Sequence, residues 1–183
     1  MLLAIDMGNT NISLGIFNER QLKHTWRIAT DVHRMPDEYG LMLSNIMSLK
    51  GINHKDITQA CMCSVVPPLT SVFEQTLHTY FNVSPLIVTP GIKTGVKLDV
   101  ENPKEVGSDR VSGVVAAFRL YGGPAIVVDF GTHAVFDAIS TEGAFLGGAI
   151  SPGIHMAAEA LFHTSSQLRR VELVSPKKAI GRD

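Results

Sequence analysis

Hydrophobic and polar residues alternate along most of the first thirty positions. The alternation fits strands over Leu2 to Asp6, Ile12 to Phe17 and Gln21 to Ala29. The pairs Gly8-Asn9 and Asn18-Glu19, which favour turns, separate these segments. The pattern therefore predicts three strands that follow one another directly.

Helical spacing begins after the third strand. Apolar residues recur every three or four positions from Pro36 to Gly51, and a proline suits the first turn of a helix. A buried strand is expected over Cys61 to Val66, closed by Pro67-Pro68, then a helix over Leu69 to Phe81 and a short strand over Leu86 to Thr89. The first part of the chain is thus predicted to be βββαβαβ.

The opening pattern recurs in the second half. Asp6-Met7-Gly8-Asn9-Thr10 follows the first apolar strand, and Asp129-Phe130-Gly131-Thr132 follows another one, Ala125 to Val128. A helix over Ser108 to Leu120 and the break Gly122-Gly123-Pro124 come before it. Further elements are expected after it, namely strands over Val135 to Ile139 and Ala144 to Ile150, a helix over Ile154 to Phe162 and a strand-like stretch over Val171 to Val174.

The two copies differ in length. The second has 60 residues from Pro124 to Asp183, whereas the first uses more than one hundred. We therefore expect an α/β protein with two lobes, residues 1–115 and 116–183. The second lobe is expected to be shortened at its C-terminus or completed by a partner.

Composition excludes several classes of protein. The 183 residues are 45% hydrophobic and 18% charged, which is typical of a folded globule. A net charge of -1 argues against nucleic acid as a partner. The N-terminus has no basic region and its apolar run stops at Asp6, so neither a signal peptide nor a membrane anchor is expected. Cys61 and Cys63 are expected to be reduced thiols of a cytosolic protein.

An aspartate that ends a buried strand and is followed by glycine suits a phosphate site. The turn presents backbone N–H groups, and the carboxylate can hold Mg²⁺ that neutralises nucleotide oxygens. A single turn of this kind fits an ordinary turn at least as well as a phosphate site, because Asp and Gly are common turn formers. Two copies that face each other across a cleft favour a nucleotide.

Another polar motif, Gly107-Ser108-Asp109-Arg110, stands at the start of an apolar helix. Ser108 or Asp109 could be the N-cap of that helix. Alternatively, Asp109 could accept a proton from a substrate hydroxyl while Arg110 neutralises an anionic group. Spacing alone favours the cap. His133, next to Thr132, could touch a phosphate or be a solvated turn residue.

Taken together, the motifs resemble those of the type III pantothenate kinases, which belong to the superfamily of acetate kinase, sugar kinases, Hsp70 and actin. The matching segments are Asp6 to Asn11, Asn102 to Arg110, Asp129 to Thr132 and Gly147 to Gly153. This resemblance covers the chain in order. It implies duplicated ribonuclease H-like lobes, as in actin-like ATPases.

The same resemblance implies an activity. It is the ATP-dependent phosphorylation of pantothenate to 4'-phosphopantothenate, the first step of coenzyme A synthesis, with Mg²⁺ and either K⁺ or NH₄⁺ as cofactors. A cytoplasmic homodimer is implied as well. A catalytically impaired relative with a regulatory role and another small-molecule kinase of the superfamily are the alternatives.

Roles for individual residues follow from the resemblance alone. ATP would be bound by Asp6, Met7, Gly8, Asn9, Thr10, Asn11, Ile12, Ser13 and Thr132. Asp6 would lie near Mg²⁺, and Asp129 would bind K⁺ or NH₄⁺. Pantothenate would be held by Val100, Gly107, Ser108, Asp109 and Arg110, with Asp109 as the general base.

Three departures from the family pattern stand out. His133-Ala134-Val135 replaces residues that usually carry hydroxyl groups, and Val100 replaces a tyrosine of the pantothenate pocket. The last motif ends at Ile180-Gly181-Arg182-Asp183, before the threonine that usually follows.

Overall fold

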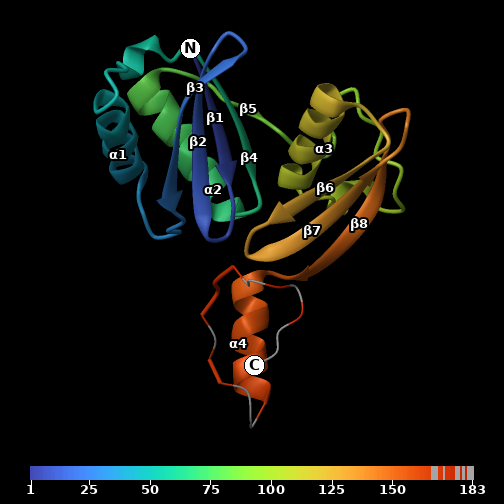
Figure 1. Ribbon diagram of the computed structural model, residues 1–183. Coiled ribbons are helices and arrows are strands. Elements are labelled where there is room, and N and C mark those ends of the chain that lie inside the picture. The colour runs from blue at the N-terminus through green and yellow to red at the C-terminus, as the bar shows by residue number, and fades with distance from the viewer. Residues whose placement is uncertain (166–168, 171, 176–177, 179, 181–183) are drawn as a thin grey trace.

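A five-stranded sheet forms the base of the first lobe in the computed structural model, which describes residues 1–165, 169–170, 172–175, 178 and 180 (Figure 1). Its strands are β1 (Leu2–Met7), β2 (Asn11–Asn18), β3 (Gln21–Ala29), β4 (Gln59–Ser64) and β5 (Leu86–Ile87), in the order β3-β2-β1-β4-β5. Strands β1 to β3 are antiparallel, and β4 and β5 run parallel to β1. The predicted order of elements is confirmed.

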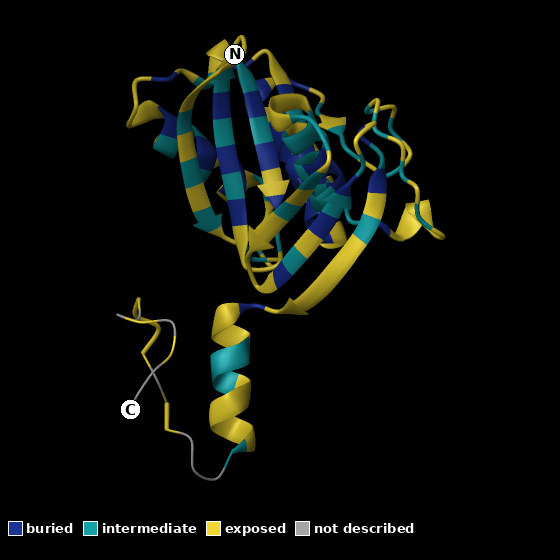
Figure 2. Cartoon of the chain, turned by 45° about the vertical axis from the view of Figure 1, so that its right-hand side comes forward, coloured by how far each residue is buried: buried dark blue, intermediate teal, exposed yellow. Residues whose placement is uncertain are grey.

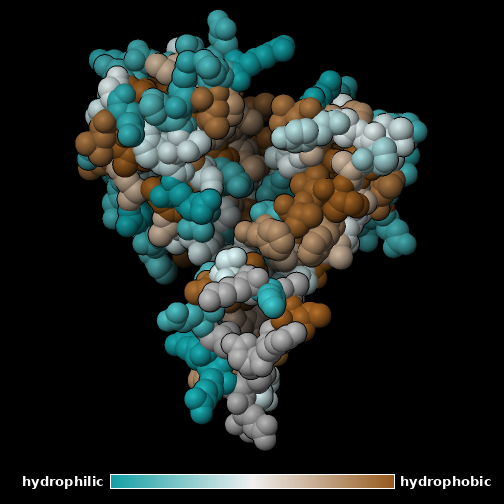
Figure 3. Space-filling model, viewed as in Figure 1, coloured by the Kyte–Doolittle hydropathy of each residue, from teal (hydrophilic) through white to brown (hydrophobic). Residues whose placement is uncertain are grey.

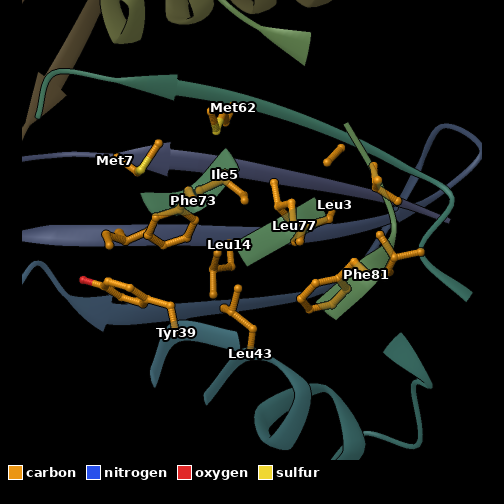
Figure 4. Packing of buried hydrophobic residues seen from close by; sticks show 14 of the residues in the cluster. Leu3, Ile5, Met7, Leu14, Tyr39, Leu43, Met62, Phe73, Leu77 and Phe81 are labelled. Carbon is orange, nitrogen blue, oxygen red and sulfur yellow. The ribbon is translucent and has the colours of Figure 1, made fainter. Parts of the chain in front are cut away.

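The helices α1 (Pro36–Ser48) and α2 (Pro67–Thr76) cover one face of this sheet. Figure 4 shows the core between these helices and the sheet, which alternate residues of β1 such as Leu3 and Met7 share with Tyr39 and Phe73. All four side chains are fully buried. Helix α1 agrees with prediction to within its last turn.

Helix α2 begins earlier than predicted. Pro67 and Pro68, expected to precede the helix, form its first turn, where a missing N–H group costs no hydrogen bond. The helix continues as a π-helical turn, η2 (Leu77–Phe81), and ends where Asn82 adopts a left-handed φ of 54°.

The second lobe repeats the first three strands. Helix α3 (Ser108–Tyr121) leads into its strands, β6 (Ala125–Phe130), β7 (His133–Ile139) and β8 (Phe145–Pro152). These strands form an antiparallel sheet in the order β6-β7-β8. Two short helices lie in connections, η1 (His54–Asp56) between α1 and β4 and η3 (Pro103–Glu105) between β5 and α3. Val111 and Val114 of α3, which a boundary after residue 115 assigns to the first lobe, share a core with Ile139 and Phe145.

The opposite face of this sheet is apolar and open to solvent. Ile126, Val128 and Phe130 are exposed there, and Figure 3 shows hydrophobic surface over this lobe. Helix α4 (Ile154–Thr164) extends away from the lobes and is largely exposed (Figure 2).

A predicted strand near the C-terminus is absent. Residues 172–174 are described and belong to no strand, so that prediction is wrong, while Val171 lies outside the described residues. A β-strand needs a partner for its backbone groups, and local β-propensity cannot supply one. Within the described residues, every helix falls short of the length and apolar character needed to cross a bilayer.

Candidate active site

A cleft of about 220 Å³ separates the two lobes, and the surface is hollowed there (Figure 3). The first lobe contributes residues of the β1–β2 hairpin and Arg27 of β3. Asp109 comes from the start of α3, and the second lobe contributes the β6–β7 hairpin from Asp129 to His133. Both D-x-G turns therefore line the same cleft, as the sequence predicts.

Four polar side chains form a row across the first sheet. The register pairs Arg27 with Ser13, Ser13 with Asp6, and Asp6 with Cys63. Because side chains alternate along a strand and the neighbours Met7 and Ile12, Leu14 and Met62 point into the core, this row lies on the opposite face. It faces the second lobe.

The turn between β1 and β2 is held by hydrogen bonds. Gly8 N donates to Asn11 O over 3.0 Å, and Thr30 Oγ1 donates to Gly8 O over 2.6 Å. Asn9, Thr10 and Asn11 are exposed at its tip. The turn can thus present backbone N–H groups and polar side chains to an anion.

Met7 and Ile12, also predicted to bind ATP, have fully buried side chains. Met7 is the last residue of β1 and Ile12 is the second residue of β2, and the alternation of side chains along each strand points both into the core. Neither residue lines the cleft, so their predicted contact with ATP stays a prediction.

The two D-x-G turns touch at their tips. Thr10 Oγ1 and Thr132 Oγ1 lie 2.7 Å apart and share a hydrogen bond between the lobes. Gly131 N donates to His133 O, which tightens the second turn. His133 begins β7 and its exposed side chain lines the cleft.

Three successive residues at the start of α3 face different partners. Ser108 Oγ donates to Ser64 O over 3.0 Å and accepts from Ser64 N over 3.1 Å, which ties the helix to β4 of the first lobe. Arg110 binds the second lobe, and Asp109 lies between them and lines the cleft. This double attachment fixes the position of the Asp109 carboxylate.

The prediction that Ser108 or Asp109 caps α3 is wrong. Gly107 is the N-cap, and no side chain bonds to the helix from that position. Ser108 Oγ is already used by Ser64, and Asp109 Oδ1 accepts from Arg110 N over 2.7 Å. A Cβ atom on Gly107 would collide with Asp109 Oδ1, so glycine leaves the room that this carboxylate occupies.

Arg110 is held by an acid that sequence analysis missed. Its Nε donates to Asp137 Oδ1 and Oδ2 over 3.1 and 3.3 Å, and Asp137 is only 3% exposed. The guanidinium also lies over the ring of Phe145 at 5.3 Å. Asp137 thus orients the Gly107–Arg110 segment from the second sheet.

Asp6 sits in an unfavourable electrostatic environment. Although it keeps access to the cleft, burial by surrounding protein raises the pKa of its carboxyl group, and the negative charges of Asp109 and Asp129 raise it further. A hydrogen bond from Cys63 Sγ to Asp6 Oδ1, 3.2 Å long, lowers the pKa in part. Burial raises the pKa of the Cys63 thiol to about 12, so it stays a neutral donor.

This donor set fits Mg²⁺ shared with a ligand. In the described part of the chain, no three His, Cys, Asp or Glu side chains are grouped closely enough to hold a metal by themselves. Mg²⁺ commonly takes one or two carboxylates and completes its shell with water and substrate phosphates. Asp6, with other carboxylates nearby, offers that kind of site.

Comparison with known proteins identifies the family. A family model described as type III pantothenate kinase matches residues 2–183. The type III pantothenate kinase of Moorella thermoacetica is 51% identical over all 183 residues, which span 72% of that protein. The corresponding protein of a Roseiflexus species is 46% identical over the same residues and is also covered to 72%.

The chain belongs to the type III pantothenate kinase family. Solved structures agree on the fold of this family member. A structure described as a Baf family transcriptional activator from Campylobacter jejuni has a TM-score of 0.52 and 21% identity, with 96% of this chain and 68% of that one covered. One described as a 2-dehydro-3-deoxygalactonokinase from Sinorhizobium meliloti has a TM-score of 0.54 and 15% identity, with 92% and 57% covered. The duplicated actin-like fold is confirmed.

Of the residues expected to hold pantothenate, Asp109 lines the cleft, whereas Val100, Gly107, Ser108 and Arg110 do not. Val100 is half-buried against the core of the second lobe and does not line the cleft between the lobes. In the final motif, Ile180 is described, and residues 181–183 lie outside the described residues. The family member's described site therefore consists of the two turns, the start of α3 and Arg27 of β3.

Arg27 and Asp137 are the site residues that sequence reasoning missed. Each lies within a predicted strand, where alternation alone does not distinguish a residue that faces a site from one that faces solvent. Arg27 is next to Ser13, and Asp137 is opposite Val127, only because of strand register. A search for charged residues within strands next to each D-x-G turn would have found both.

Proposed function

We propose that this chain phosphorylates pantothenate with ATP to give 4'-phosphopantothenate, the first step of coenzyme A synthesis. The observation that carries the proposal is the meeting of Asp6, Asp109 and Asp129 in one cleft between two D-x-G turns. Membership of the type III pantothenate kinase family supports the choice of substrates.

Asp109 is proposed as the general base. Its carboxylate accepts the proton of the pantothenate hydroxyl as that oxygen forms a bond to the γ-phosphorus, the bond to the bridging oxygen breaks, and ADP leaves. The attachments of Ser108 to the first lobe and of Arg110 to the second keep this carboxylate in place. Positioning accounts for most of the rate in such transfers.

The two turns are proposed to hold the phosphates of ATP. Backbone N–H groups of the Gly8–Asn11 turn and the hydroxyl groups of Thr10 and Thr132 reach the cleft from opposite lobes. Asp6 would hold Mg²⁺, whose charge offsets that of the phosphate oxygens. Asp129, exposed on the other wall, would hold K⁺ or NH₄⁺.

The direct test is ATP-dependent phosphorylation of pantothenate by the purified chain. ADP release is followed by a coupled assay and 4'-phosphopantothenate by mass spectrometry, with K⁺ present or replaced by Na⁺. Acetate and hexoses serve as control acceptors. Product from pantothenate alone is expected, and product from a control acceptor instead would overturn the proposed substrate.

Replacement of Asp6 by asparagine is expected to raise the Mg²⁺ concentration for half-maximal activity at least tenfold. The amide keeps the shape of the side chain and can still accept the Cys63 hydrogen bond, but it lacks the charge that attracts the cation. Asp56→Asn is the matched control, since this exposed carboxylate lies outside the cleft. An unchanged Mg²⁺ titration would contradict the role of Asp6.

The raised pKa of Asp6 adds a pH signature to the same experiment. As the pH falls, Asp6 becomes protonated earlier than an ordinary aspartate, so the apparent Mg²⁺ affinity of the wild type is expected to weaken sooner. The raised pKa also means that the folded state binds this proton more tightly than the unfolded state. Protonated Asp6 therefore stabilises the folded state at low pH, and this contribution is lost as the pH rises through the folded pKa. At pH 7 the ionised carboxylate is unfavourable in the folded protein, so Asp6→Asn is expected to melt at a slightly higher temperature than the wild type.

A cytoplasmic homodimer completes the proposal. Its support is the resemblance of the motifs to the family, and the exposed apolar residues of β6 provide surface that a second chain could cover. Sedimentation equilibrium is expected to give twice the 19.8 kDa mass of one chain. A monomer at micromolar concentration would contradict the dimer and leave the kinase proposal intact.

A further inference from the structure

Arg27 of β3 lines the cleft between the lobes. Among the described residues that line the space between the lobes, it is the one Lys or Arg side chain, and it shares that space with Asp6, Asp109 and Asp129. Its position follows from the row across the first sheet, in which Ser13 separates it from Asp6.

The guanidinium of Arg27 has no partner within the part of the chain that the structure describes. No hydrogen bond or ion pair joins it to any of the three nearby carboxylates. Arg34 and Arg110 differ, because each is paired with an aspartate. An exposed arginine that faces a cleft without an internal partner is available to a ligand.

Distance along the sheet places Arg27 beside the phosphate turn. Neighbouring strands are about 4.8 Å apart, so Arg27 lies roughly 10 Å from Asp6 along the row. An extended arginine side chain covers most of that distance. Arg27 is also two residues from Ala29, which pairs with Asn11 at the end of the turn.

Because the cleft is lined by carboxylates, a positive charge at the position of Arg27 would stabilise bound phosphate groups. ATP that enters meets three carboxylates, and the turns offer neutral N–H and hydroxyl donors. A guanidinium supplies a permanent positive charge and a fork of donors that matches two oxygens of one phosphate.

We propose that Arg27 binds oxygens of the ATP phosphate chain, on the side of Asp6 away from Asp109. This inference rests on the proposed function, since it assumes that the cleft receives ATP. It makes Arg27 a substrate-binding residue and leaves Asp109 as the base.

The test compares Arg27→Gln, Arg27→Lys and Arg20→Gln with the wild type. Arg20 is exposed at the far turn of the same β2–β3 hairpin, so its replacement removes an equal charge outside the cleft. Dissociation constants for MgATP and adenosine are measured by calorimetry, and kcat and KM by the coupled assay. The expected result for Arg27→Gln is at least about tenfold weaker ATP binding, typical of a lost charge-assisted contact, with adenosine binding unchanged.

Arg27→Lys is expected to recover only part of the ATP affinity, because an ammonium group lacks the planar fork. Equal ATP binding by Arg27→Gln and the wild type would overturn the inference, as would an equal loss for ATP and adenosine. A wild type that binds ATP but phosphorylates no pantothenate would refute the proposed function and leave the binding comparison valid. A wild type that binds no ATP would refute both.

Discussion

Asp109→Asn is expected to lower kcat by about 100-fold to 10,000-fold, the usual contribution of a general base. The amide cannot accept the proton of the pantothenate hydroxyl. It can still accept the hydrogen bond from Arg110 N, so the start of α3 keeps its geometry. Steady-state kinetics with saturating ATP and pantothenate would measure the loss, and an unchanged melting temperature would show that the fold is retained.

A matched control removes a carboxylate outside the cleft. Asp99 is exposed and pairs with Lys97 over 2.8 Å, and an exposed pair of this kind contributes little to stability. Asp99→Asn is therefore expected to turn over like the wild type. The KM for ATP should change little in Asp109→Asn, because its proposed partner is the acceptor hydroxyl. Normal turnover by Asp109→Asn would contradict the assignment of the base.

The antiparallel strands of both lobes were predictable because their signal is local. Residues 2–6, 12–17 and 21–29 alternate in polarity, and each strand pairs with the next one along the chain. Neighbouring strands joined by short turns need no distant partner to be recognised. The repeat of the D-x-G turn then indicated that a second lobe follows the same plan.

Prediction failed where structure depends on distant neighbours. Residues 172–174 have the composition of a strand but belong to no strand. Spacing alone favoured Ser108 or Asp109 as the cap of α3, but Ser64 of β4 takes the Ser108 hydroxyl group. In both cases the deciding contact lies far along the chain, and propensity says nothing about it.

The candidate site was predictable only in part for the same reason. Motifs identified Asp6, Asp109 and Asp129, which end strands or begin a helix and are flanked by glycine. The supporting residues, Arg27 and Asp137, lie in the middle of strands. Their proximity to the motifs is set by sheet register, which requires the assembled lobes.

Asp137→Ala is expected to be the most destabilising single change near the site. It would leave the Arg110 guanidinium, whose side chain is 20% exposed, without the carboxylate that binds it. Removal of one partner of a buried ion pair costs about 3–5 kcal/mol. For a chain of this size each kcal/mol lowers the melting temperature by about 2–4 °C, so a fall of roughly 10 °C should be seen by calorimetry.

The same change is expected to impair catalysis beyond its effect on folding. Arg110 follows Asp109 directly, and its ion pair with Asp137 joins this segment to the second lobe, beside the packing of Arg110 over Phe145. At a temperature where Asp137→Ala is fully folded, kcat/KM for pantothenate should fall at least tenfold while the KM for ATP changes less. Wild-type kinetics in the folded variant would show that Asp137 only stabilises the lobe.

A double replacement separates the two effects. Arg110→Met together with Asp137→Leu removes both charges and fills the space with apolar side chains next to Phe145. Such exchanges of a buried pair are often neutral or stabilising, so the melting temperature should return toward the wild-type value. Activity should not return, because the guanidinium that steadies Asp109 is gone. If the double variant regained both stability and turnover, the pair would be a packing element without a part in positioning the base.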